Sequence, residues 1–149
     1  MTTNQATTSN PRNWVRVVGG GLAAGLIINA FEYGVHRIYL DDAWSAAFHA
    51  LGKTPTGWSA FIPGNFLIGI LLVWLYARLR GRYGSGTKTA LRSALAVWVV
   101  FWAVPLLSFV PMKLFPNRLL AIAILLGVVD VTLAGLLGAW IYRDRLRPY

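Results

Sequence analysis

Long runs of apolar residues dominate the chain, and they fall into four blocks separated by short polar segments. The blocks cover residues 14–38, 61–80, 89–110 and 118–142. Each block is long enough to cross a hydrocarbon layer of about 30 Å, which takes about 20 residues of α-helix. None of the blocks shows the alternation of apolar and polar positions that membrane β-strands need, so the pattern predicts four transmembrane helices.

The composition supports this assignment. Of the 149 residues, 56% are hydrophobic and 13% are charged, and the mean hydropathy of +0.55 is far above that of a typical soluble domain. Cysteine is absent, which excludes disulfides and thiolate metal sites. The two histidines are too few for a zinc site unless carboxylates complete it. We therefore expect no cofactor and no bound metal.

The segments outside the four blocks complete the predicted architecture. We expect an all-α membrane protein, a four-helix transmembrane bundle over residues 13–143, with a disordered cytoplasmic tail at 1–12 and a basic cytoplasmic tail at 144–149. Between the first two spans, the stretch "DDAWSAAFHALG" (41–52) predicts a short amphipathic interfacial helix, because its apolar residues recur at helical spacing. Such a helix would lie in the outer interface or fold back over the bundle.

Lysine and arginine are distributed unevenly between the two ends of the predicted spans. Because positively charged loops stay in the cytoplasm, we predict a multi-pass membrane protein with both termini cytoplasmic. The ten basic residues on the side of the termini are Arg12, Arg16, Arg78, Arg80, Arg82, Lys88, Arg92, Arg143, Arg145 and Arg147, and the four on the other side are Arg37, Lys53, Lys113 and Arg118. The asymmetry supplies most of the net charge of +9. It suits contact with anionic lipid headgroups and requires no nucleic acid partner.

Polar side chains interrupt the first span in a helical pattern. Gly25, Asn29, Glu32 and His36 follow one another at intervals of four, three and four residues, which places them on one face of an α-helix. Small residues continue the same face, so we expect it to point into the bundle rather than toward lipid. At a spacing of four residues, Glu32 and His36 lie within pairing distance of each other.

Two other spans carry polar residues in apolar surroundings. Asn65 lies near the outer end of the second span, and Asp130 lies in the middle of the fourth. At ~1.5 Å per residue, Asn65 is ~6 Å below the outer ends of the spans, Glu32 roughly 9–12 Å and Asp130 ~18 Å. These depths allow one slanted polar cavity that opens outward, although they differ too much to require it.

Three interpretations of Asn29, Glu32, His36, Asn65 and Asp130 stay open. In the first, the side chains hydrogen-bond across helices and fix their register, which stabilises a membrane bundle by only about 0.6 kcal/mol per contact. In the second, the outward-facing cluster binds a proton, a cation or a small ligand, because intramembrane carboxylates mark functional sites. The third, an intramembrane enzyme centred on Glu32 and His36, is the least favoured, because no nucleophile or metal motif accompanies them.

Small residues mark the predicted helix contacts. Gly21 and Gly25 form a small-xxx-small pair in the first span, and glycines recur in the fourth. Packing inside the bundle accounts for them, but a homodimer or a larger membrane complex is also open, with the protein as an accessory or scaffold subunit that docks through these faces. In the third span, we expect Pro105 to kink the helix and Trp98 and Trp102 to pack against a neighbour.

Three stretches, "GGLAAGLIINAFE", "GILLVWLYARLRGRYGSGTKTA" and "AGLLGAWIYR", carry a resemblance to a group of known proteins. From about residue 16 to residue 143, the chain resembles a family of uncharacterised small four-span bacterial inner-membrane proteins. The motifs are glycine and aromatic-belt patterns, which are not specific to an activity. The resemblance implies a bacterial inner-membrane protein without an assigned chemistry, and it transfers no catalytic residue.

Overall fold

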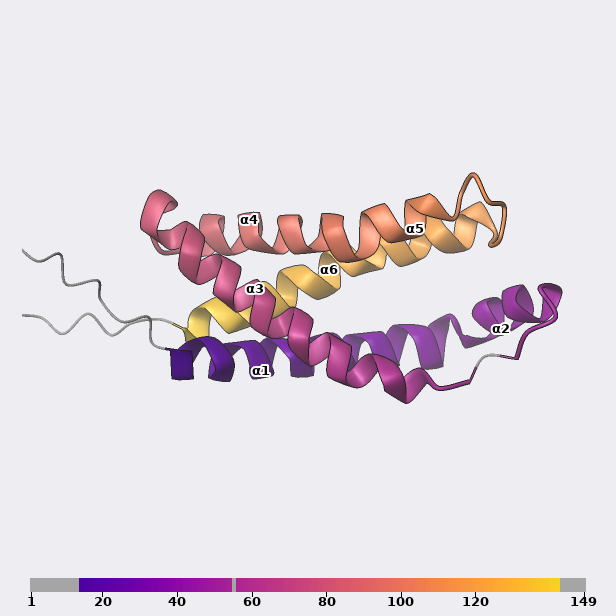
Figure 1. The fold of residues 1–149 in the computed structure, drawn as a ribbon, viewed down its shortest axis with the longest axis horizontal. Helices are drawn as coiled ribbons and strands as arrows, with labels where there is room; N and C mark the ends of the chain where they lie inside the picture. Colours follow the sequence, from indigo (N-terminus) through magenta and orange to yellow (C-terminus); the bar gives the residue numbers. More distant parts are fainter. Residues whose placement is uncertain (1–13, 55, 143–149) are drawn as a thin grey trace, which may run out of the picture.

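Helices account for the ordered elements of the protein (Figure 1). The computed structural model describes residues 14–54 and 56–142, so the tails predicted at 1–12 and 144–149 lie outside the described residues. Two elements, η1 and η3, are π-helical, and η2 is a 3-10 turn. In chain order the elements are α1 (Trp14–Glu32), η1 (Tyr33–Tyr39), α2 (Asp41–Ala50), η2 (Trp58–Ala60), α3 (Phe61–Tyr83), α4 (Thr87–Trp98), η3 (Val99–Ala103), α5 (Val104–Ser108) and α6 (Asn117–Ile141).

The four predicted spans and the all-α fold class are confirmed. Each helical stretch that is long and apolar enough to cross a membrane lies within three residues of its predicted bounds. These stretches are Trp14–Tyr39, Phe61–Tyr83, Thr87–Ser108 and Asn117–Ile141. Large apolar side chains are exposed on the outside of each of them, such as Leu26, Leu67, Leu95 and Leu125. Apolar exposure on all four helices is what a surface in contact with lipid requires.

The third span is not a continuous α-helix, because η3 separates α4 from α5. Pro105 is the second residue of α5. A proline has no N–H to offer the carbonyl four residues earlier, which here belongs to Phe101 in η3. The disturbance expected at Pro105 therefore takes the form of wider π-helical turns just before the proline, an adjustment that membrane helices tolerate.

The bundle has two unlike ends. At one end, α1 and α4 begin and α3 and α6 finish; arginines and lysines of α3 and α4 gather there, and we call it the basic end. At the opposite end lie α2 and the connection between α5 and α6, and toward this end α1 diverges from α5 and α6 (Figure 1). This divergence sets the place of the candidate site.

The closest helix contact is the crossing of α1 and α3, and glycine makes it possible. A Cβ atom added to Gly69 of α3 would collide with the backbone of Gly21 and Gly25 in α1, and one added to Gly21 would lie 2.5 Å from the Cα atom of Ile70. On another face of α1, a Cβ atom at Gly20 would lie 2.9 Å from the carbonyl oxygen of Gly138 in α6. These small residues are therefore used in helix packing inside the chain.

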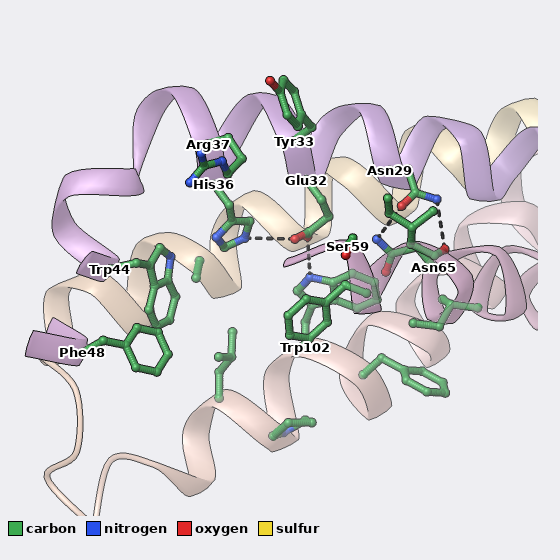
Figure 2. Close-up of a pocket in the computed structure, with 17 residues that line it drawn as sticks. Asn29, Glu32, Tyr33, His36, Arg37, Trp44, Phe48, Ser59, Asn65 and Trp102 are labelled. Carbon is green, nitrogen blue, oxygen red and sulfur yellow. Dashed lines mark hydrogen bonds and ion pairs between the residues drawn. The ribbon is translucent and has the colours of Figure 1, made fainter. Parts of the chain in front are cut away.

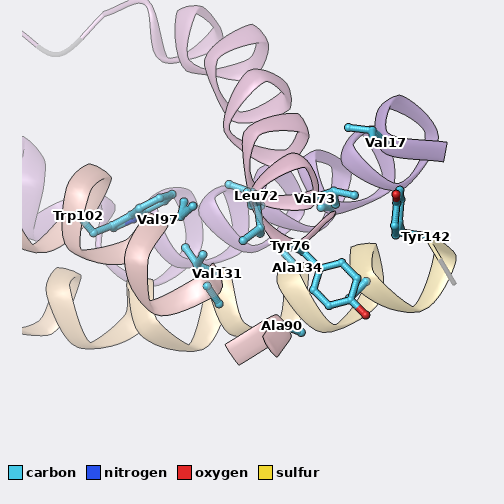
Figure 3. Close-up of a cluster of buried hydrophobic side chains, with 14 residues drawn as sticks. Val17, Leu72, Val73, Tyr76, Ala90, Val97, Trp102, Val131, Ala134 and Tyr142 are labelled. Atoms are coloured by element: carbon cyan, nitrogen blue, oxygen red, sulfur yellow. The ribbon is translucent and has the colours of Figure 1, made fainter. Parts of the chain in front are cut away.

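The main hydrophobic core lies in the half of the bundle next to the basic end (Figure 3). In lipid, the hydrophobic effect does not drive helices together, so close packing of complementary side chains has to hold this core. The core ends at Trp102, where the helices begin to diverge. Its buried members are Val17, Ala24, Ile28, Leu72, Val73, Tyr76, Ala90, Ala94, Val97, Trp102, Val131, Ala134, Ala139 and Tyr142.

A second hydrophobic cluster closes the opposite end. The predicted amphipathic helix is α2, and of its two expected placements the structure shows the second, folded back over the bundle. Trp44 and Ala47 are buried in one cluster with Leu119 and Ala123 of α6. The ring of Trp44 meets that of Phe115 edge to face, with 5.4 Å between the ring centroids. This contact fixes α2 and η1 as one wall of the space between the diverging helices.

Replacing Gly69 by alanine tests the α1–α3 crossing. We expect Gly69→Ala to lower the free energy of unfolding in detergent by about 1–3 kcal/mol, because the added methyl group meets backbone atoms that cannot rotate away. Gly64→Ala is the matched control on the same helix, where an added Cβ has no atom within 4 Å. It should raise stability by up to about 1 kcal/mol through helix propensity. Equal effects of the two substitutions on the thermal midpoint would contradict the crossing.

Candidate functional site

A cavity of about 540 Å³ lies between the diverging helices in the half away from the basic end (Figure 2). Side chains from α1, η1 and α2 line one part of it, and side chains from α3, η3, α5 and α6 line the rest. Of the five residues predicted from the sequence, the structure brings four together at this cavity: Asn29, Glu32, His36 and Asn65. The fifth, Asp130, is not among the lining residues.

Glu32 contacts two other side chains of the cavity, one from η1 and one from η3. It is the last residue of α1, and its Oε2 lies 3.0 Å from Nε2 of His36, so the pairing predicted from their spacing is confirmed. Its Oε1 accepts a hydrogen bond of 3.3 Å from the indole Nε1 of Trp102. The carboxyl group points between these two partners in Figure 2. The side chain is still 27% exposed, so the two contacts orient the carboxyl group and leave part of it open to the cavity.

Asn29 and Asn65 fasten α1 to α3. The Nδ2 of Asn65 donates to Oδ1 of Asn29 at 3.1 Å. The Nδ2 of Asn29 in turn donates to the carbonyl oxygen of Gly25 at 2.9 Å and to that of Ile62 at 3.3 Å. Both amide hydrogens of Asn29 are therefore used. This pair fits the first interpretation of the polar cluster, in which side chains fix the register of two helices.

Trp102 joins three helices at the inner boundary of the cavity. Besides its hydrogen bond to Glu32, its ring lies against Gly127 of α6, where an added Cβ would overlap the indole. Trp98, one turn earlier, donates its Nε1 hydrogen to the carbonyl oxygen of Ile124 at 2.9 Å. The prediction that both tryptophans pack against a neighbour is confirmed. The contact with Glu32 was missed, although a buried indole N–H needs an acceptor and could have pointed to a carboxylate at similar depth.

Both partners of the Glu32–Trp102 contact stand at π-helical turns. Glu32 immediately precedes η1, and Trp102 lies inside η3. A π-helical turn shifts the register of a helix by one residue, and such turns occur frequently at functional sites. The hydrophobic pattern along the chain follows the average helical period and does not report a local change of this kind, so these turns could not be predicted.

Aromatic rings form much of the cavity wall. Those of Trp44 and Phe48 come from α2, Phe61 from α3, and Phe101 and Trp102 from η3. Tyr33 also contributes to the lining, but its ring points away from Glu32 in Figure 2 and is 65% exposed. The cavity therefore combines an apolar, largely aromatic wall with a few polar groups, which is the usual make-up of a small-molecule site.

Glu32 is the acid that faces the cavity. Arg37 lines the cavity, and its Nη1 lies 2.6 Å from Oδ1 of Asp41, so that cation has a partner on its own segment. Among the described residues that line the cavity, Glu32 is the only acidic one. The described part of the chain contains no group of three or more acidic, histidine or cysteine residues that could hold a metal ion.

Asp130 occupies a different environment, in the interior of α6. It is 0% exposed, and neither of its carboxyl oxygens has a hydrogen-bond partner among the described residues. It follows Gly127 by one helical turn, and the ring of Trp102 that packs on Gly127 also donates to Glu32. The slanted cavity suggested by the sequence thus includes Asn65 and Glu32 but stops short of Asp130, because the ring of Trp102 and the core fill the space around it.

A double-mutant cycle tests the contact between Trp102 and Glu32. We expect Trp102→Phe and Glu32→Met to be non-additive by about 0.5–1 kcal/mol in the free energy of unfolding, because either change removes the same hydrogen bond. Trp98→Phe combined with Glu32→Met is the control pair, since Trp98 donates to Ile124 instead. The control should be additive within about 0.3–0.5 kcal/mol. Coupling of the same size in both cycles would rule out a specific contact.

Comparison with known proteins adds no family. No protein-family model, no curated protein and no solved structure matches this chain. The chemistry of the cavity is therefore the basis on which a function is assigned.

Proposed function

We propose that the protein is a membrane protein that binds a small organic cation in the cavity between α1–η1 and η3–α5, with Glu32 as the counter-ion. The observation that carries this proposal is the partly exposed carboxyl group of Glu32 on an aromatic wall. Aromatic faces attract cations through the negative potential above the ring, and a carboxylate adds a full charge. Both attractions are stronger where water is largely excluded.

The chemistry of the wall favours an organic cation over a metal ion. Calcium and magnesium need about six oxygen ligands, whereas the cavity offers one acid together with amides that already hold helices together. Apolar and aromatic walls give no ligands to a bare ion, but they contact the carbon atoms of an alkyl- or aryl-substituted ammonium group. A cavity of about 540 Å³ is of the size that holds drug-sized molecules.

The state of Glu32 also favours binding over a purely structural role. A carboxyl group that only fixed two helices would be expected to use its full hydrogen-bonding capacity on them, as Asn29 does with both amide hydrogens. Glu32 makes one contact with each of two partners and keeps part of its surface on the cavity. Intramembrane acids of this kind are costly to insert and are functional candidates by default.

We further propose that the protein spans the inner membrane of a bacterium several times, with both termini and the basic end in the cytoplasm and the cavity toward the outer side. The charge asymmetry between the ends supports this orientation. At the basic end, arginines lie over aromatic rings, with Arg78 5.1 Å from the ring centre of Trp74 and Arg92 4.5 Å from that of Tyr83. Such pairs suit the interface, where anionic headgroups would meet the guanidinium groups.

A fusion to Tyr149 of a fluorescent reporter that matures only in the cytoplasm tests the orientation. We expect bright cells, because the basic end retains the adjoining termini in the cytoplasm. The same reporter inserted after Gly57, between α2 and α3, is the control and should stay dark. Bright insertion and dark terminal fusion together would reverse the orientation.

Binding of tetraphenylphosphonium, measured by calorimetry in mild detergent, tests the cation site. We expect Glu32→Gln to weaken binding about tenfold or more, since loss of about 1.4 kcal/mol corresponds to each factor of ten. Asp42→Asn removes an exposed carboxylate from α2 and should leave the affinity unchanged. Tetraphenylborate has nearly the same shape and the opposite charge, so it separates charge recognition from uptake into the micelle. Equal affinity of the parent protein for both ions would contradict the proposal.

A further inference from the structure

A second acid stands one helical turn from the place where Trp102 meets α6. Asp130 follows Gly127 by three residues, so the two lie on neighbouring positions of one helix face. The ring of Trp102 packs on Gly127, and its Nε1 donates to Glu32. One side chain therefore contacts both the acid of the cavity and the helix segment that carries the buried acid.

The groups that face Asp130 include no cation that pairs with it. From α1 comes Glu32, whose charge acts on Asp130 and whose carboxyl group is bonded to His36 of η1. The basic residues of α1, α3 and α4 lie near the basic end, Arg118 lies at the far end of α6, and η3 and α5 carry no charged residue. The two buried hydroxyl groups of α4 donate to carbonyl oxygens, that of Ser93 to Thr89 and that of Thr89 to Gly84. Neither oxygen of Asp130 is hydrogen-bonded by any of these described groups.

An ionised carboxylate in this position would be unpaired in a medium of low dielectric constant. Such a charge is strongly disfavoured unless a cation or several donors accompany it. A negative charge on Glu32 adds repulsion. The neutral acid is thus the form that the packing around Asp130 accommodates while the cavity holds no cation.

We propose that Asp130 holds a proton in the interior of the bundle and releases it when a cation binds beside Glu32. The inference rests on the proposed function, because the cation site at Glu32 is its trigger. Burial and the charge of Glu32 both oppose ionisation of Asp130, and a bound cation removes the second of these by offsetting the charge of Glu32. The O–H bond of Asp130 then breaks, and the proton passes to water in the cavity when the ring of Trp102, which separates the acid from the cavity, moves aside. One positive charge enters as one departs, so the net charge of the interior does not change.

This coupling is reciprocal. If cation binding releases a proton, a rise in pH must tighten cation binding, by at most about tenfold per pH unit for one proton. Trp102 stands at the boundary between the two acids, and its hydrogen bond to Glu32 is the contact that an incoming cation would compete with. The cavity and the buried acid then act as one exchange site for a cation and a proton.

The proton on Asp130 is measured without any ligand. Infrared spectra of the parent protein at neutral pH should contain a carbonyl band of a protonated carboxylic acid that is absent in Asp130→Asn. The control Asp42→Asn removes an exposed carboxyl group and should keep the band. Asp130→Ala, which is smaller than aspartate and cannot clash, provides a second variant if the asparagine variant does not fold. A parent spectrum without the band overturns the inference.

The coupling is measured as proton release in a weakly buffered detergent solution on addition of tetraphenylphosphonium. The parent protein should release about one proton for each cation bound. Asp130→Asn should still bind the cation, release almost none, and lose the dependence of its affinity on pH. Equal release by Asp130→Asn and the parent would assign the proton to another group and overturn the inference, as would binding by the parent without release. Failure of the parent to bind the cation at all contradicts the proposed function and the coupling with it, while the infrared band still decides whether Asp130 carries a proton.

Discussion

The close approach of α1 and α3 at their glycines governs the rest of the structure. Two helix backbones in van der Waals contact at Gly21, Gly25 and Gly69 leave no room for side chains between them, so the helices cross there and separate beyond it. The core fills the half of the bundle on the side of the basic end and finishes at Trp102. On the other side of Trp102 the elements meet again only in the cluster around Trp44 and Phe115, and the cavity opens between the core and that cluster.

The polar side chains inside the bundle differ in how far their hydrogen-bonding capacity is satisfied. The amides of Asn29 and Asn65 satisfy each other and nearby carbonyl groups, and they extend the α1–α3 contact beyond the glycines. Glu32 has partners but keeps an open side on the cavity. Asp130 has no partner among the described residues. A polar group without a partner lowers the stability of the fold wherever water is absent. The two asparagines therefore stabilise the bundle, whereas Asp130 destabilises it, and a functional role is the reason to expect an acid at that position.

Much of the fold could be predicted because it follows from local patterns. The spans follow from runs of apolar residues, and the inward face of Glu32 and His36 follows from helical spacing on one segment. The exclusion of Asp130 from the cavity could not be predicted, because it depends on how α6 is rotated and tilted against α1, which no single segment encodes. The partner of Trp102 was missed for the same reason. The π-helical turns at η1 and η3 could not be predicted, because the hydrophobic pattern gives only the average helical period.

The arrangement of two acids at different depths has a consequence for charge. Bringing a cation alone into an interior of low dielectric constant is costly, and so is leaving an acid there ionised without a counter-charge. An exchange avoids both states. The interior holds either the cation beside Glu32 or the proton on Asp130, and so it always contains one of the two positive charges. Such an exchange requires that the charges of the two acids interact while their carboxyl groups lie in separate environments. Trp102 meets that requirement, because its ring separates the cavity from the core while its N–H holds Glu32 in place.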